Sequence, residues 1–112
     1  MPTRLPDSNE AILDIRKIQD YCLNPAHPRG RHKARVFREA LDLQQTDASW
    51  LRAVLLEAAR LGEALQIGDD PWGTYWRVDA TVRRQGKIAV VRTIWIVRTG
   101  DSMPRFVTCW VL

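Results

Sequence analysis

Hydrophobic residues follow two different periods along this chain, and the change of period falls near residue 74. Before it, apolar positions recur every three or four residues, which is typical of amphipathic helices; after it, they alternate, which is typical of strands. We therefore expect an α+β fold, with about three N-terminal helices packed on one face of a C-terminal antiparallel sheet of three to four strands. Short links between consecutive strands favour an antiparallel meander.

Three segments of the N-terminal half carry the helical period. Pro25 and Pro28 separate the first from the second, because two prolines three residues apart do not fit inside one helix. The third segment has the clearest apolar stripe and follows a helix cap at Thr46 or Asp47. The predicted helices span residues 15–23, about 30–41, and 47–65, and a short strand is expected at 11–13.

The C-terminal half reads as strands. An acidic turn is expected over Asp69–Gly73, and Gly86 closes a hairpin between the first two strands. The long second strand is apolar on both faces, which favours a central place in the sheet. The predicted strands span residues 75–82, 87–98 and 105–111.

The chain has 112 residues, enough for the single domain 1–112 that we expect, with residues 1–10 as a loose lead-in. Its uncharged apolar runs, such as the five residues Thr93–Val97 and the seven residues 106–112, are far short of a membrane span. The polar N-terminus does not resemble a secretory signal, and Cys22 and Cys109 are too few for a disulfide framework. These features predict a cytoplasmic protein with no membrane partner.

The charge is basic, with 17 Lys and Arg against 13 acids and a net charge of +4. Five basic residues fall within residues 29–38, and His32 lies among them. Arginine makes up most of the basic total, and its planar fork matches phosphate, so the bias favours a nucleic-acid partner. The alternative is an arginine-rich composition on solvated faces.

Two places in the chain are candidates for binding phosphate. His32 and Lys33 begin the second helix, where backbone amides and side-chain cations favour anions; the alternative is a solvated basic helix start. Arg92 lies mid-strand, either as an anion-binding group beside the hydroxyls of Thr93 and Thr108 or paired across strands with Asp79.

The remaining motifs limit which ligands and cofactors the chain is expected to bind. Trp72 lies between turn residues and Trp110 near the C-terminus, and either is a candidate for stacking on a base, although most of the tryptophans are expected to pack. The chain has no glycine-rich phosphate loop, no His-Glu-x-x-His zinc signature and no Cys-x-x-Cys pair. We therefore expect no metal and no cofactor.

Two stretches of the sequence resemble motifs of a known family. Residues 20–37 contain Tyr-Cys-Leu-Asn-Pro-Ala-His-Pro followed by Gly-Arg-His-Lys-Ala, and residues 91–108 contain Val-Arg-Thr-Ile-Trp and later Pro-Arg-Phe-Val-Thr. They resemble the N- and C-terminal signatures of a small family of uncharacterised bacterial domains, found alone or at the C-terminal tips of large toxins. Cys22 and Val36 stand where that family usually has Leu and Phe, and Cys109-Trp110 replaces Ala-Tyr.

The order of helices before an antiparallel sheet is also similar to the barnase, colicin D and RelE group of ribonuclease toxins. That similarity implies a metal-independent endoribonuclease toxin that cleaves tRNA or mRNA by 2′-hydroxyl transesterification and is neutralised by a cognate antitoxin or immunity protein. The alternatives are a non-catalytic module that binds nucleic acid or protein, and an immunity or antitoxin protein. The candidate catalytic residues are His32, Lys33, Arg92, Thr93 and Thr108, and the candidate RNA contacts are Arg29, Arg31, Arg35, Arg105 and Trp72.

Overall fold

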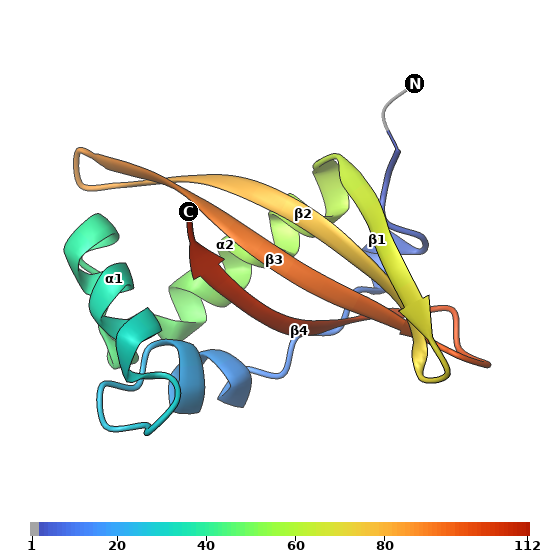
Figure 1. The fold of residues 1–112 in the computed structure, drawn as a ribbon. Coiled ribbons are helices and arrows are strands. Elements are labelled where there is room, and N and C mark those ends of the chain that lie inside the picture. The colour runs from blue at the N-terminus through green and yellow to red at the C-terminus, as the bar shows by residue number, and fades with distance from the viewer. Residues whose placement is uncertain (1–2) are drawn as a thin grey trace.

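The computed structural model describes residues 3–112 and confirms the α+β architecture. Helices come first, and a four-stranded antiparallel sheet follows in the order β1-β2-β3-β4 (Figure 1). Single 3₁₀ turns at Ser8–Glu10 and Gln45–Asp47 accompany them. The main elements are η2 (Ile18–Cys22), α1 (Arg31–Leu41), α2 (Ala48–Leu61), β1 (Ala64–Asp70), β2 (Gly73–Arg84), β3 (Lys87–Arg98) and β4 (Pro104–Val111).

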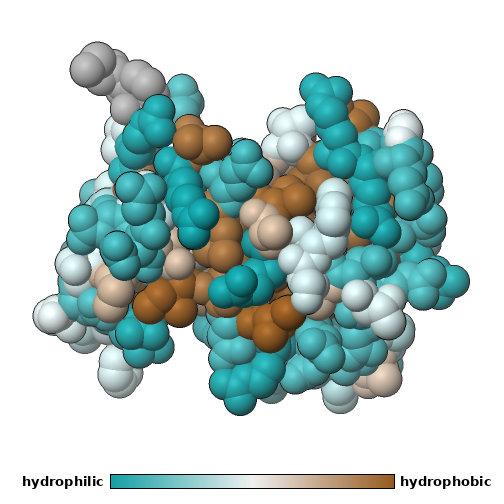
Figure 2. Space-filling view, turned by 180° about the vertical axis from the view of Figure 1, so that it is seen from behind, coloured by the Kyte–Doolittle hydropathy of each residue, from teal (hydrophilic) through white to brown (hydrophobic). Residues whose placement is uncertain are grey.

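The helices cover one face of the sheet, and the core lies between them. Alternation along β3 buries Val91 and Trp95 on that face, where Phe37 of α1 and Leu51 of α2 are also buried. The other face of β3 is only partly covered. Figure 2 views the molecule from the helix side and shows hydrophobic side chains gathered between hydrophilic margins. The amphipathic period of the helices thus has a direct structural cause, because each buries one stripe against the sheet.

The third helix is shorter than predicted, and a strand replaces its end. The helix α2 ends at Leu61, and Gly62 has extended backbone, after which the chain turns into β1. Leu65 and Ile67 of β1 are 53% and 47% exposed, so their spacing does not reflect a buried helical stripe. The sequence analysis missed this strand because an edge strand with both faces largely in solvent leaves no alternating pattern.

The N-terminal segment also differs from the prediction. The expected loose lead-in is mostly exposed, but it is attached to the core at two points, since Leu5 is buried and the Thr3 carbonyl accepts a hydrogen bond from Ala64. The strand expected at 11–13 is reduced to one parallel bridge between Ile12 and Arg105. The first predicted helix forms over residues 16–22, of which Ile18–Cys22 make up the π-helical segment η2. These parts gain order from the contacts they make with the sheet and helix rather than from a periodic pattern.

Candidate functional site

The edge of β4 that faces the start of α1 brings together a lysine, a threonine hydroxyl and two aromatic rings. The Lys33 ammonium of α1 donates a hydrogen bond to the Thr108 hydroxyl of β4 at 2.7 Å. The same Nζ lies 5.1 Å from the ring centroid of Tyr21 and 5.6 Å from that of Trp110. The sequence predicted both Lys33 and Thr108, and the fold brings them together although they lie 75 positions apart in the chain.

The loop between η2 and α1 holds Lys33 and Tyr21 in place. Asn24 closes a turn by accepting from the Ala26 amide, and Nδ1 of His27 accepts from the amides of Arg29 and Gly30. The His27 ring packs edge-on against Tyr21, with centroids 4.7 Å apart. These contacts explain the structural role of Asn24 and His27 in the Asn-Pro-Ala-His-Pro stretch of this chain.

Gly30 at the end of this loop has a separate structural role. A Cβ at Gly30 would overlap the backbone carbonyl oxygen of Tyr21. The close approach of the two backbone segments therefore requires glycine at this position, which explains the glycine of the signature on steric grounds.

Within the described residues, the positive charge at this edge has no carboxylate counter-ion. Among residues 3–112, no carboxylate lies within ion-pair distance of Lys33. Lys17 adds a second ammonium nearby and donates to the Phe106 carbonyl at 2.9 Å. A cavity of about 350 Å³ is lined by Lys17, Tyr21, Lys33, Val107 and Thr108. A small, cationic cavity with a phenol and a hydroxyl in its wall is suited to an anionic ligand.

Two thiols lie beneath this edge. Cys22 of η2 and Cys109 of β4 are buried, with their Sγ atoms 3.8 Å apart. The hydrogen bond from the Cys109 thiol, aided by the charge of Lys33, lowers the pKa of Cys22 to about 7. The same contact together with burial raises the pKa of Cys109 well above its ordinary value. The positive charge of Lys33 therefore also influences the pKa of a buried thiol below the cavity.

Arg92 and Thr93, neighbours on β3, do not join the cavity. Arg92 donates from Nε and Nη2 to the two carboxylate oxygens of Asp79 at 2.9 and 3.0 Å, the pairing that the sequence analysis weighed against anion binding. Thr93 is 1% exposed on the opposite face; its hydroxyl donates to the Val78 carbonyl and accepts from the Trp95 indole. Its expected place as a hydroxyl beside a ligand on the open face is therefore wrong, because strand alternation turns it into the core.

The other candidate residues are dispersed. His32 is exposed on α1 and lines a second cavity together with Arg31 and Arg35, while Arg29 lies in the loop before α1. Arg105 contacts Asp101 at 3.5 Å. Trp72 is 75% exposed in the turn between β1 and β2, and Figure 1 places that turn at the end of the sheet away from α1. The fold thus divides these candidates among three regions.

Lys17 and Tyr21 were missed as site residues. Lys17 lies in an irregular helical segment far from any basic run, so no sequence signal indicated it. Tyr21 stands in the N-terminal signature and could have been found there. Within the described part of the chain, no three His, Cys, Asp or Glu side chains group as metal ligands. None of its helices is both long and apolar enough to cross a membrane.

The fold and the site together define a small α+β domain with a small cationic cavity at a helix–sheet edge. Residues 4–112 match the model of the domain of unknown function DUF6883, and the chain belongs to that family. A search of the curated proteins gave no significant match.

Among solved structures, the chain is similar to a chain of the contact-dependent growth inhibition toxin–immunity protein complex from Klebsiella pneumoniae 342. The TM-score is 0.66 and the identity 14%, over 90% of this chain and 99% of that chain. At that identity the likeness shows a shared fold.

Proposed function

We propose that this chain is the toxin of a bacterial growth-inhibition system and that it cleaves RNA without a metal ion. The observation that carries the proposal is the half-buried Lys33 ammonium, which has a hydroxyl and two aromatic rings around it and no carboxylate partner in residues 3–112. Such a cation favours a bound anion because burial without a counter-charge is costly. The net charge of +4 favours a polyanion.

The toxin-system part of the proposal is supported by the fold shared with a chain of a toxin–immunity complex. A cognate immunity or antitoxin protein would then be the partner of this chain. The basic charge favours the toxin over the immunity role, because a protein that blocks a nuclease by imitating RNA carries an acidic surface.

The cavity provides groups for transesterification. The 2′-hydroxyl attacks the neighbouring phosphorus and the bond from phosphorus to the 5′-oxygen breaks, which leaves a 2′,3′-cyclic phosphate and a 5′-hydroxyl. In this proposal Lys33, with Lys17 beside it, stabilises the charge on the phosphoryl oxygens, and Thr108 orients Lys33. A base takes the 2′-hydroxyl proton and an acid protonates the leaving 5′-oxygen; we assign proton transfer to Tyr21, with His32 as the second candidate.

The test is induction of the protein in bacteria, with growth and total RNA followed together. We expect growth arrest and discrete RNA fragments that carry 5′-hydroxyl ends, and the purified protein should give the same fragments in the presence of a chelator. Lys33→Met should lower cleavage by roughly 100-fold or more, as removal of one transition-state donor does. Tyr21→Phe and His32→Ala decide which side chain transfers the proton.

Lys87→Met is the matched control, because it removes the same charge from an exposed position in the β2–β3 hairpin. It should cleave like the wild type. Full activity of Lys33→Met would show that the site is wrong. Abundant folded protein with normal growth and intact RNA would reject the nuclease, and salt-sensitive RNA binding without products would identify a binding module instead.

A further inference from the structure

A second cavity lies on the other flank of α1 and is not used by the Lys33 site. It measures about 670 Å³, within the ~300–1,000 Å³ typical of small-ligand sites. It is bounded by α1, by the chain at Leu23 and Pro25, and by the segment 43–46 that leads into α2. We call it the arginine groove. Successive residues on a helix are turned by about 100°, so His32 lines this groove while Lys33 faces the β4 edge.

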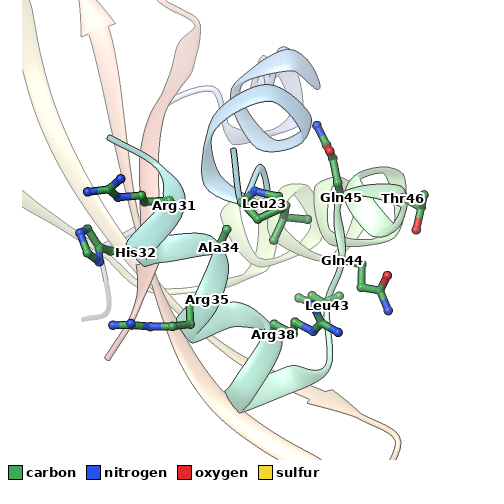
Figure 3. A pocket seen from close by; sticks show the side chains of 11 residues that line it. Leu23, Arg31, His32, Ala34, Arg35, Arg38, Leu43, Gln44, Gln45 and Thr46 are labelled. Atoms are coloured by element: carbon green, nitrogen blue, oxygen red, sulfur yellow. The ribbon is translucent and has the colours of Figure 1, made fainter. Parts of the chain in front are cut away.

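One wall of the arginine groove is cationic. Arg31, Arg35 and Arg38 are spaced four and three residues apart and are exposed. No carboxylate in residues 3–112 lies within ion-pair distance of any of the three. Figure 3 shows the ends of Arg31, His32 and Arg35 directed to the same side of α1, with Arg38 lying next to Leu43. Unpaired guanidinium groups along one helix, such as those of Arg31 and Arg35, suit phosphoryl oxygens.

The floor of the groove is apolar and its far rim is polar. Leu23, Ala34 and Leu43 line it and are each no more than 5% exposed. Opposite the arginines stand Gln44, Gln45 and Thr46. The amide nitrogen of Gln45 donates to the Gln19 carbonyl at 2.8 Å, which fixes the direction of its amide oxygen. An apolar floor beside amide and hydroxyl groups suits a heterocyclic ring with polar edges.

We propose that the arginine groove binds one nucleotide of a single-stranded RNA, with the base on the Leu23–Leu43 floor and the phosphate on Arg31 and Arg35. A nucleotide carries a planar ring and a phosphate in one small ligand and so uses both surfaces. An acidic peptide would use the arginines but leave the apolar floor without a partner. This inference rests on the proposed function: it makes the groove a subsite for a nucleotide next to the scissile phosphate held by Lys33.

The experiment titrates the isotope-labelled full chain with the four nucleoside 5′-monophosphates and, separately, with inorganic phosphate, following backbone amides by NMR. We expect saturable shifts within residues 31–38 and 43–46, with nucleotides binding roughly 5-fold or more tightly than phosphate because stacking adds to the charge. Arg35→Gln should weaken nucleotide binding by about the same factor. Arg60→Gln, which removes an exposed arginine of α2 outside the groove, should not change it.

Three results would overturn the inference: no shifts in the groove, equal affinity for phosphate and nucleotides, or equal or tighter binding of a hexaglutamate peptide, which would indicate a protein-facing surface. Lys33→Met separates this inference from the proposed function. It should bind nucleotides normally while losing cleavage, whereas Arg35→Gln should raise KM and leave kcat unchanged. Nucleotide binding in the groove without any cleavage by the wild type would reject the nuclease alone.

Discussion

The sheet and α1 both carry cations, and some of the sheet cations have carboxylate partners of a kind that the α1 cations lack within residues 3–112. Arg92 is held by Asp79, and Arg105 contacts Asp101. Around α1, Lys33 and Arg35 have no carboxylate within ion-pair distance in the described chain. A paired cation must first release its own anion before it binds another, so the presence or absence of an internal partner locates an anion site better than the number of charges does.

The importance of the unpaired charge can be tested by giving Lys33 a carboxylate partner. Thr108→Asp places a carboxylate where the hydroxyl now accepts from Lys33, in contact with the ammonium. We expect RNA cleavage to fall by roughly 100-fold, because an internal ion pair then replaces the attraction for phosphate. The measurement is the rate of fragment formation from total RNA.

Thr108→Asn is the matched control, since asparagine has nearly the same shape as aspartate but no charge. It should keep cleavage within about 5-fold of the wild type, because a neutral hydrogen bond contributes little net energy. Cleavage by Thr108→Asp at the rate of Thr108→Asn would show that the unpaired charge of Lys33 is not what matters at this edge.

The next largest effect concerns stability and contrasts Thr93 with its neighbour Arg92. Thr93→Val leaves the Trp95 indole N–H buried without an acceptor and the Val78 carbonyl without this donor. We expect a loss of about 1–3 kcal/mol in the free energy of unfolding, the typical cost of an unsatisfied buried polar group. Chemical denaturation measures it.

Thr81→Val on the exposed face of β2 is the control for this loss and should change stability by less than roughly 0.5 kcal/mol. Cleavage by folded Thr93→Val should match the wild type at low temperature. Loss of cleavage without loss of stability would instead indicate that Thr93 takes part in the cleavage reaction.

The sequence predicted the fold well where side chains alternate between core and solvent in a regular way. The amphipathic helices and the strands β2, β3 and β4 have that pattern, and the separate basic and hydroxyl signals at Lys33 and Thr108 proved to be neighbours. It failed where order comes from single tertiary contacts. The edge strand β1 has no buried face, and the segment that carries Tyr21 is shaped by hydrogen bonds of the following loop.

The site prediction failed at Thr93 for a related reason. Residues 92 and 93 are neighbours in sequence, and a strand turns such neighbours to opposite faces. Arg92 and Thr93 therefore did not fit one ligand site, and the Thr-x-Trp motif marks a buried hydrogen bond between Thr93 and Trp95. A sequence motif does not by itself separate residues that bind a ligand from residues that hold a strand in place.

The smallest predicted effect comes from removing the carboxylate of Asp79 that pairs with Arg92. The Arg92 guanidinium lowers the pKa of the Asp79 carboxyl, so the pair stabilises the fold above the ordinary Asp pKa, and this contribution is lost as pH falls through the lowered value. Asp79→Asn should therefore lower Tm at pH 7 by less than about 3 °C, as expected for an accessible ion pair, and the difference from the wild type should shrink below about pH 4. Freed Arg92 should strengthen RNA binding by at most about 3-fold, as one added surface phosphate contact does. An increase as large as the loss in Thr108→Asp would place Arg92, rather than Lys33, at the centre of the anion site.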